Sequence, residues 1–287
     1  MNALTGSIHV PDKVSEEEAM RRTTHLAIGA HPDDLEIFAY HGIEVCYRNR
    51  EKWFGGVTVT DGAGCPGQSK EDREKAGLIQ AVRRREQIEA ANIGEYSFQC
   101  QLGYTSDAVK DYASSRELVT TLTTILERCP VEVLYLHNPA DKHPTHLAVL
   151  QRCVEAIRNL PKEKRPLRVL GCEVWRGLDW LRDSDKVILP VDRHPELARK
   201  LIEVFKSQIE DSKDYVRATL GRRYANATFL ESHAVDAVPA YIYTMDLKPL
   251  MENDHMTLAD LLSIHLDHFR EDVLKSVQLM NPNPNES

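Results

Sequence analysis

The sequence lacks the features that mark membrane, secreted or nucleic-acid-binding proteins. No uninterrupted apolar run approaches the roughly 20 residues of a membrane-spanning helix, and no basic start precedes an apolar block at the N-terminus. The six cysteines form no CxxC pair, which is typical of reduced thiols rather than of a disulfide framework. With a formal charge of −8, the chain has no overall footprint for nucleic acid or an anionic membrane. We therefore expect a cytoplasmic protein without a membrane span, a signal peptide or a nucleic-acid partner.

What the sequence does contain is an alternation of short apolar runs and longer amphipathic stretches. At 287 residues and 42% hydrophobic composition, it can bury a large core. Strands are expected at 26–30, 53–60, 131–137, 168–175 and 186–192, and helices at 36–50, 71–92, 114–129 and 145–160. This alternation predicts an α/β fold, a Rossmann-like three-layer sandwich with a largely parallel central sheet and helices on both faces.

After residue 191 the alternation changes. A helix is expected at 194–211, a strand at 240–247 and a second helix at 257–277, followed by the polar tail NPNPNES. There is no internal repeat and no low-complexity linker. We therefore expect one domain over residues 1–287. It would have a core at about 24–190, a C-terminal α/β extension at 191–280 and a disordered tail at 281–287.

The stretch HLAIGAHPDD, residues 25–34, places an imidazole and two adjacent carboxylates directly after an apolar strand. Two neighbouring carboxylates repel each other, and removing both from water is costly unless a cation offsets their charge. In parallel α/β sheets, ligand sites gather at the carboxyl ends of the strands. His31, Asp33 and Asp34 are therefore candidates for a metal site.

A second stretch, VEVLYLHNPADKHPTHLAV at residues 131–149, has a similar arrangement. An apolar strand leads into His137, and Asp141, His143 and His146 follow, the last two spaced i, i+3 at the expected start of a helix. A parallel sheet can bring strand ends that are distant in sequence into one crevice. The two clusters can therefore form one site.

These side chains divide into metal ligands and proton-transfer groups. Zinc prefers nitrogen, oxygen and sulfur ligands in a tetrahedral arrangement, and catalytic sites keep one position for water. His31, Asp34 and His146 would form such a site, and the same donors also accept Fe²⁺ or Co²⁺. Asp33 would then be free to act as a general base, and His143 as a general acid or oxyanion stabiliser.

Each motif also has a purely structural explanation. HPDD can cap a helix, because Asp is favoured at the N-cap and Pro in the first turn, and an isolated HxxH can be surface decoration. Arg83 suits a solvated helix face and Arg176 follows a strand, yet either could reach a substrate. The glycine-rich segment 61–67 is expected to be a rim loop, and 221–229 either a surface turn or an anion contact. Because both acid and histidine clusters follow apolar strands, we favour the metal site.

Together the two motifs resemble a known family. AHPDD after one strand and HPTH after a later one are similar to the LmbE/PIG-L superfamily of zinc-dependent N-acetylglucosaminyl deacetylases. The similarity covers about residues 24–150, and it includes a helix with Arg83 and Glu86 in an RxxE arrangement before Gly94. Beyond residue 180 only the layout is similar.

The resemblance implies an activity and a role for each residue. His31, Asp34 and His146 would bind zinc. Asp33 would be the general base, and His143 would protonate the leaving amine or stabilise the oxyanion. The reaction would remove the N-acetyl group from an N-acetylglucosamine-type amino sugar or conjugate, releasing acetate and a free amine. Family members often form trimers or hexamers, so the resemblance also implies a homo-oligomer.

The chain departs from the family pattern in the second motif. Many members read HPDH where this chain reads HPTH, so Thr145 lacks a carboxylate that could orient a neighbouring histidine. Asp141 is the candidate replacement. Asp141, Arg83 and Arg176 are also candidates for substrate contact, and the arginines leave room for a phosphorylated or carboxylated amino sugar.

Two other classes of function stay open on the sequence. A metal-dependent phosphoesterase would also use His and Asp, but two-metal sites usually need more carboxylates and bridging ligands than the motifs supply. A non-catalytic sugar- or metal-binding protein would hold a structural zinc ion with four protein ligands, whereas the candidate site has three and an open position.

Overall fold

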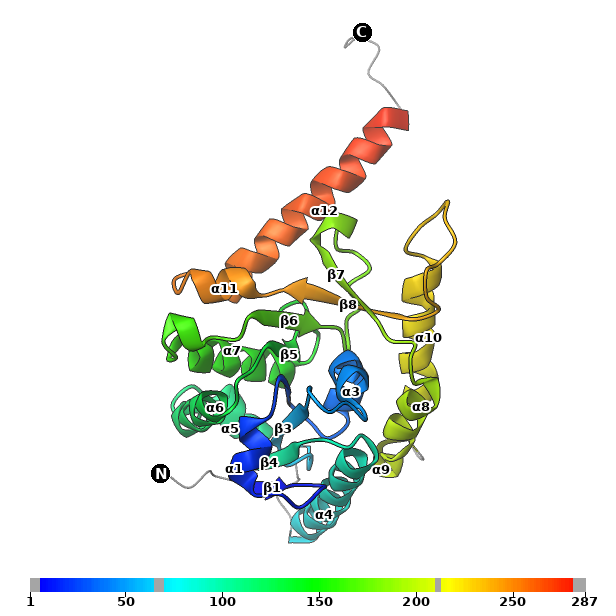
Figure 1. Ribbon diagram of the computed structural model, residues 1–287. Helices are drawn as coiled ribbons and strands as arrows, with labels where there is room; N and C mark the ends of the chain where they lie inside the picture. Colours follow the sequence, from blue (N-terminus) through cyan, green and yellow to red (C-terminus); the bar gives the residue numbers. More distant parts are fainter. Residues whose placement is uncertain (1–5, 65–69, 210–212, 281–287) are drawn as a thin grey trace.

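A central sheet organises the molecule, for which a computed structural model describes residues 6–64, 70–209 and 213–280. Its eight strands follow the order β1-β4-β3-β2-β5-β6-β8-β7 (Figure 1). They are β1 (Ser7–His9), β2 (His25–Gly29), β3 (Phe54–Thr60), β4 (Phe98–Tyr104), β5 (Val133–His137), β6 (Arg168–Cys172), β7 (Lys186–Pro190) and β8 (Tyr241–Asp246).

The interior of the sheet is parallel and its edges are antiparallel. Strands β4, β3, β2, β5 and β6 run parallel to their neighbours, whereas β1, β8 and β7 pair antiparallel. Every residue of β2 and β3 is buried, as expected for strands covered on both faces. The α/β fold with a mostly parallel sheet, predicted from the alternation of the sequence, is confirmed.

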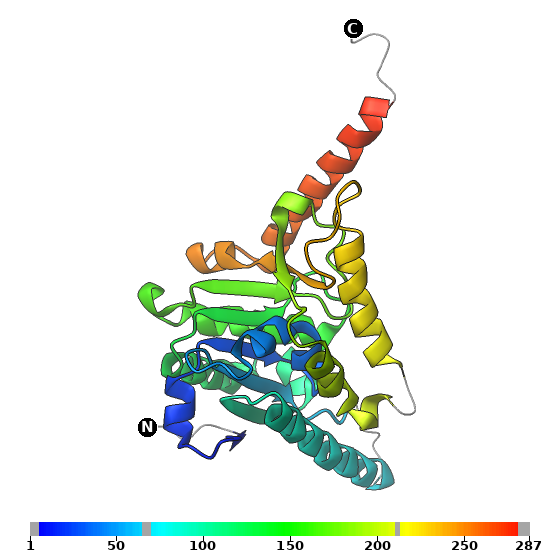
Figure 2. The same ribbon diagram turned by 45° about the vertical axis from the view of Figure 1, so that its right-hand side comes forward.

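Helices cover both faces of the sheet (Figures 1 and 2). One apolar layer packs α1, α5, α6, α7, α11 and the start of α12 against the sheet, and the other packs α2, α3, α4, α8 and α10. The helices are α1 (Glu16–Arg21), α2 (Asp34–Phe38), α3 (Tyr40–Cys46), α4 (Lys70–Ile93), α5 (Ser106–Lys110), α6 (Arg116–Arg128), α7 (Pro144–Arg158), α8 (Pro195–Glu203), α9 (Lys206–Ile209), α10 (Tyr215–Thr228), α11 (Lys248–Glu252) and α12 (Leu258–Met280). Short 3₁₀ helices lie at Lys162–Lys164 and Asp183–Asp185.

Several elements differ from the expectations drawn from the sequence. The stretch 36–50 forms two short helices rather than one, because the backbone leaves helical geometry at Ala39. Strand β4 was missed, since its sequence FQCQLGY includes two glutamines; Gln99 is buried and donates to Thr58 of β3 instead of facing water. The segment 221–229 is not a surface turn, because nearly all of it lies inside α10.

The C-terminal extension is built into the same sheet. Strand β8 lies between β6 and β7, so a segment more than 50 residues after β7 separates the two strands that precede it. Helix α12 then leaves the body of the molecule and projects away from the sheet in both views (Figures 1 and 2). The expected helix at 194–211 corresponds to α8 and α9, and its last two residues lie outside the described part of the chain.

Two expectations about compartment and composition can be compared with the structure. Among the described residues, no helix is long and apolar enough to cross a membrane. Five described cysteines, Cys46, Cys100, Cys129, Cys153 and Cys172, are buried and free. Cys65, with the rest of 65–67 in the expected rim loop, and the expected tail at 281–287 lie outside the described residues.

Candidate metal centre and active site

The two histidine and acid clusters meet because their strands are neighbours. Strands β2 and β5 pair in parallel, so the loops after them leave the same edge of the sheet. The β2 loop carries His31 and Asp33 and leads into α2, whose first residue is Asp34. The β5 loop carries His143, the N-cap residue of α7, and His146 lies in the first turn of that helix. A separation of over one hundred residues is thus closed by strand order alone.

Three donor groups converge at the centre of this site. His31 Nδ1 lies 3.1 Å from His146 Nε2, and Asp34 places Oδ2 3.4 Å from His31 Nδ1 and Oδ1 3.4 Å from His146 Nε2. The second carboxylate oxygen is also fixed, because the His31 backbone N–H donates to Asp34 Oδ2 at 2.6 Å. His146 and Asp34 are both buried, whereas His31 is partly open to the cavity.

His137, the last residue of β5, also contacts this group. Its Nε2 lies 3.4 Å from Asp34 Oδ2, so Asp34, His137 and His146 form a second possible donor set, beside His31, His143 and His146. However, the Ala30 backbone N–H donates to His137 Nε2 at 3.0 Å. That hydrogen bond uses the nitrogen lone pair a metal would need. His137 is therefore less suited to binding a metal ion than His31 or His146.

Asp33 stands in an unusual backbone conformation. Its φ is 91°, in the left-handed region that non-glycine residues seldom adopt. It occupies the N-cap position of α2, yet its side chain makes no capping hydrogen bond and instead lines the cavity. The simple capping explanation of HPDD therefore does not describe this aspartate. Strain of this kind persists where the surrounding structure holds a side chain for a purpose.

The pKa values of the two adjacent aspartates shift in opposite directions. Burial, together with the negative charges of Asp34 and Glu36, raises the pKa of Asp33 well above its usual value. Burial acts in the same direction on Asp34, but the imidazoles of His146 and His137 outweigh it and hold the pKa of that carboxyl well below its usual value. Separated pKa values in a pair of acids are typical of residues with different catalytic roles. The two carboxyls therefore hold their protons over different pH ranges.

His143 presents one ring nitrogen to the cavity side. The Thr145 backbone N–H donates to His143 Nδ1 at 3.3 Å, which places the proton of the neutral ring on Nε2. Burial and the nearby His31 lower the pKa of His143 from its usual value. The ring stands edge-on to His31, with 4.8 Å between ring centroids. An Nε2–H here can donate to a substrate oxygen or nitrogen.

Asp141 lies behind the histidines rather than in the cavity. Its Oδ1 accepts the His143 backbone N–H at 2.8 Å and lies 3.4 Å from His146 Nδ1, and its Oδ2 accepts the Trp175 N–H at 3.2 Å. The carboxylate thereby fixes the tautomer of His146 that leaves Nε2 free for a metal. Position 145 is a threonine and supplies no carboxylate, and Asp141 is the nearby acid that contacts both histidines.

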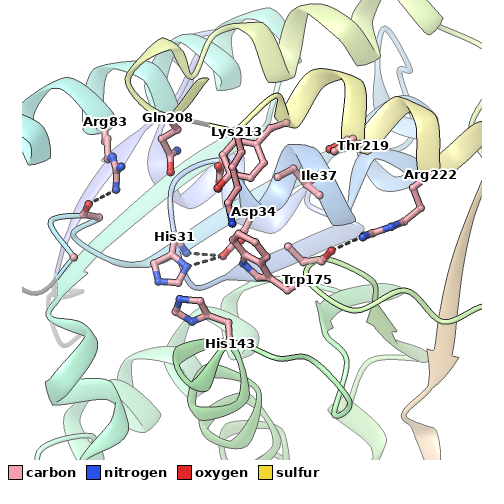
Figure 3. A pocket seen from close by; sticks show the side chains of 16 residues that line it. His31, Asp34, Ile37, Arg83, His143, Trp175, Gln208, Lys213, Thr219 and Arg222 are labelled. Atoms are coloured by element: carbon pink, nitrogen blue, oxygen red, sulfur yellow. Dashed lines mark hydrogen bonds and ion pairs between the residues drawn. The ribbon is translucent and has the colours of Figure 1, made fainter. Parts of the chain in front are cut away.

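A cavity of about 350 Å³ opens above these groups (Figure 3). His31, Asp34 and His143 lie at one side of it, and Trp175 stands beside them. Trp175 and Tyr215 meet edge to face at 6.2 Å between ring centroids, and both line the cavity. An aromatic wall next to acidic and imidazole groups suits the apolar face of a sugar ring.

Three cationic side chains also line the cavity. Arg83 donates to the Gly62 carbonyl, Arg222 donates to the Val174 carbonyl, and Lys213 Nζ lies 4.3 Å from the centre of the Trp175 ring. Arg176, in contrast, is exposed, donates to the Ala140 carbonyl at 2.5 Å and is not among the lining residues. Of the three residues expected to touch substrate, Arg83 alone lines the cavity.

The RxxE pattern of α4 has a structural basis. Glu86 accepts hydrogen bonds from the Ser207 backbone N–H at 2.8 Å and from its hydroxyl at 2.6 Å. This holds α9 beside the cavity, where Gln208 donates to the Pro32 carbonyl at 2.8 Å. Arg83 thus faces the cavity while Glu86 fixes one of its walls.

The aromatic wall and its lysine were missed from the sequence. Trp175, Lys213 and Tyr215 belong to no recognisable motif, and α10 brings Tyr215 back from the C-terminal extension. The only available signal was the position of Trp175 just after β6, at the same sheet edge as the histidines. His137 had a clearer signal, as the last residue of its strand.

Comparison with protein families gives a match over the part of the chain that carries both motifs. Residues 26–157 match the family model described as PIG-L: GlcNAc-PI de-N-acetylase. The match covers 132 of the 287 residues and makes this part of the chain similar to the PIG-L/LmbE family. This match spans β2 to α7 and so includes His31, Asp33, Asp34, His143 and His146. No curated protein matches the sequence.

Solved structures share the fold of this chain. The N,N'-diacetylchitobiose deacetylase from Pyrococcus horikoshii is 18% identical, with a TM-score of 0.59 over 85% of this chain and 90% of that one. The conserved protein TT1542 from Thermus thermophilus is 18% identical, with a TM-score of 0.57 over 78% and 94%. A zinc-inhibited form of the teicoplanin deacetylase Orf2 is 16% identical, with a TM-score of 0.56 over 78% and 97%.

Proposed function

We propose that this chain is a zinc-dependent hydrolase that removes the N-acetyl group from an N-acetylglucosamine-type amino sugar or conjugate. The observation that carries the proposal is the pair Asp33 and Asp34, with opposite pKa shifts, beside two imidazoles that point at one spot. The family description names a de-N-acetylase, and the structures from Pyrococcus horikoshii and of Orf2 are named as deacetylases. These names support the same reaction class for this chain.

The donors of the candidate centre suit a zinc ion. In a tetrahedral site with bonds of about 2.0–2.1 Å, ligand atoms lie about 3.4 Å apart. The separations of 3.1, 3.4 and 3.4 Å among His31 Nδ1, His146 Nε2 and Asp34 agree with that spacing. His146 is kept neutral because burial lowers its pKa to about 4, as a metal ligand requires. His31, Asp34 and His146 are therefore the proposed ligands, which could also hold Fe²⁺ or Co²⁺.

A bound divalent cation would polarise the acetyl carbonyl and lower the pKa of water in the cavity. Asp33 would take the proton of the attacking water, since burial raises the pKa of its carboxyl and makes it a stronger base than an exposed aspartate. His143 donates a hydrogen bond through Nε2–H to the oxygen that becomes negative, and the proton that Asp33 took from water passes to the amine nitrogen as the carbon–nitrogen bond breaks. Asp141 keeps His143 and His146 in place. The products are acetate and the free amino sugar.

The cavity also favours a particular kind of substrate. The aromatic pair Trp175 and Tyr215 can stack on a sugar ring, and Arg83, Lys213 and Arg222 surround it with positive charge. We extend the proposal to an amino sugar that carries a phosphate or carboxylate group. Arg83 and Arg222 already donate to backbone carbonyls, so Lys213 is the cation most available to such a group.

The test measures amine release from plain, phosphorylated, carboxylated and glycosidic N-acetyl amino sugars by the zinc-loaded protein and its Asp33→Asn variant. Asn tolerates the left-handed backbone of residue 33, so the variant keeps the fold and the three ligands. We expect the variant to retain zinc and to lose at least about 100-fold in turnover. Equal turnover in both proteins would remove Asp33 from the mechanism.

The same assay separates the alternatives. Hydrolysis of phosphate esters without amide cleavage would favour a phosphoesterase. Zinc bound without turnover of any class would favour a non-catalytic sugar-binding protein. The hydratase GalB from Pseudomonas putida KT2440 has a TM-score of 0.56 at 16% identity, so the fold alone does not select hydrolysis. An assay for water addition to an unsaturated acid therefore belongs in the panel.

Three broader expectations stay proposals. Residues 1–287 form one domain, which the insertion of β8 between β6 and β7 supports. The protein works in the cytoplasm, consistent with its five buried free thiols. It forms a trimer or hexamer, and the exposed apolar side chains along α12 support self-association. They include Leu266, Phe269, Val273 and Val277.

A further inference from the structure

A second cluster of metal-type donors lies far from the cavity, at the root of α12. His265 and His268 are spaced i, i+3 on that helix and face Asp185, the residue just before β7. Strands β6 and β8 separate β7 from β5, whose loop holds the candidate active site. Asp185 and His265 are largely buried, with side-chain exposures of 12% and 11%, whereas His268 is 34% exposed. None of these residues lines the cavity described above.

His268 presents one ring nitrogen to Asp185. Its Nδ1 lies 2.7 Å from Asp185 Oδ2, which can only accept, and 3.1 Å from Arg182 Nη2, which can only donate. Arg182 already donates to Asp185 Oδ1, so His268 Nδ1 donates its proton to Oδ2 when no metal ion is bound. In a zinc-bound form this proton would leave, and Nδ1 and Oδ2 would move apart by about 0.5 Å to the spacing of two ligands on one ion.

His265 gives an independent indication. Both of its ring nitrogens are buried and have no hydrogen-bond partner among the described residues. Its Nδ1 lies 3.6 Å from Asp185 Oδ2, beyond hydrogen-bond distance but close to the spacing of two ligands on one zinc ion. Buried imidazole nitrogens are normally paired, so the two unpaired nitrogens of His265, of which Nδ1 faces a carboxylate, call for a ligand.

Arg182 binds one oxygen of the Asp185 carboxylate and leaves the other free to bind a metal ion. Its Nη2 donates to Asp185 Oδ1 at 3.0 Å, which turns Oδ2 toward the two histidines. This is the arrangement in which an outer group orients a carboxylate ligand. The positive charge of the guanidinium opposes a second cation, so the site should bind more weakly than one without it.

We propose that Asp185, His265 and His268 form a second binding site for a divalent transition-metal ion, with zinc as the expected ion. Imidazole and carboxylate donors suit zinc. The ion would fasten α12 to the start of β7. Apart from buried Leu261 and the contact of Phe269 with Trp180, that helix has few anchors to the body. This role is structural and separate from catalysis.

Metal stoichiometry of the full chain tests the proposal. The protein is stripped with chelator, dialysed, titrated with ZnCl₂ and analysed by mass spectrometry of the bound metal. We expect two equivalents in the wild type and one in both Asp185→Asn and His265→Ala/His268→Ala. The control is His255→Ala, an exposed histidine in the turn before α12, which should keep two. Zinc should also raise the melting temperature of a His146→Ala protein, and Asp185→Asn should abolish that increase.

The outcomes separate this site from the catalytic one. A single equivalent in the wild type that persists in His146→Ala and disappears in Asp185→Asn supports the α12 site and contradicts the proposed zinc ligands of the cavity. A single equivalent that disappears in His146→Ala overturns the α12 site. Equal stoichiometry in the wild type and Asp185→Asn overturns it too, and shows that Arg182, Asp185 and His268 form an ion-pair cluster only. Because Asp185→Asn and His265→Ala/His268→Ala remove different donors, either variant that folds is enough to assign the second equivalent.

Discussion

At the scale of single residues, the candidate active site depends on what surrounds two identical side chains. Asp33 and Asp34 are consecutive, yet Asp33 has a left-handed backbone and no imidazole partner, whereas Asp34 lies between His31, His137 and His146. Burial therefore dominates the pKa of Asp33, and the nearby imidazoles dominate that of Asp34. The opposite pKa shifts of these consecutive aspartates therefore follow from their different surroundings.

A substitution of Asp141 tests whether this carboxylate strengthens zinc binding by His146. In an Asp141→Asn variant the three proposed ligands stay, but the neutral amide no longer strengthens His146 as a donor. We expect zinc affinity to fall by about 10- to 100-fold, as measured by competition with a chromophoric chelator. An exposed control, Asp236→Asn, should leave affinity unchanged. Equal affinity in the wild type and Asp141→Asn would show that the carboxylate does not act on the metal ligands.

At the scale of helices and strands, two buried histidines make the stability of the fold depend on pH. His25 begins β2, and His41 of α3 contacts the Tyr135 hydroxyl of β5 at 2.8 Å. Burial, aided by nearby positive charges, lowers the pKa of each histidine to about 4. The unfolded chain therefore binds more protons than the folded one between the unfolded value of 6.5 and about 4. Stability from these groups is present above pH 6.5 and is lost as the pH falls through this range.

Urea unfolding at pH 7 and pH 5 measures this effect. Each buried histidine should lower the free energy of unfolding by about 1 to 2 kcal/mol between the two pH values. In a His41→Gln variant the loss should be smaller by the share of one histidine, whereas replacement of exposed His233 should leave it unchanged. Identical losses in the wild type and the His41→Gln variant would show that His41 does not titrate in this way.

The segment that leads into α10 carries the proposed specificity for charge. Lys213 lies over Trp175 at the rim of the cavity, so Lys213→Ala removes a positive charge without touching the ligands. We expect KM for a phosphorylated or carboxylated substrate to rise about fivefold, equivalent to about 1 kcal/mol for an exposed charge pair, with kcat nearly unchanged. KM for a neutral substrate should stay constant. Lys200→Ala, on α8 and outside the cavity lining, is the matched control.

At the scale of the whole molecule, α12 is the feature that the rest of the fold does not cover. It projects from the body (Figure 2) and exposes an apolar stripe that includes Val273 and Val277, which are 42% and 55% exposed. The two valines are four residues apart and therefore lie on one helix face, as at a helix–helix contact. A stripe of this kind is a natural contact for other copies of the chain.

Light scattering after size exclusion tests that contact. The wild type should elute as a trimer or hexamer, and Val273→Glu/Val277→Glu should elute as a smaller species. Lys275→Glu changes the net charge by the same amount but lies on the opposite face of α12, so it should not alter the mass. A monomeric wild type would contradict self-association, and equal masses for all three proteins would place the interface elsewhere.

The sequence by itself determined the local features of this protein. The apolar periodicity of strands such as β2 and β5 and of helices such as α6 and α7 depends on neighbours a few residues apart, so it is visible in one dimension. The same is true of HPDD and HPTH, whose spacing and position after strands predicted one crevice. Where polar residues occupy buried positions, as with Gln99 in β4, that periodicity disappears and the element was missed.

Only the tertiary structure decided which distant residues meet. Strand order placed β5 beside β2 and inserted β8 between β6 and β7, and neither follows from local pattern. The tertiary structure also placed Trp175, Lys213 and Tyr215 around the cavity and left Arg176 outside it. It placed Asp185 next to His265 and His268 of α12. The physical reason is that contacts across a sheet depend on long-range pairing, whose free energy comes from burying whole elements together rather than from any single residue.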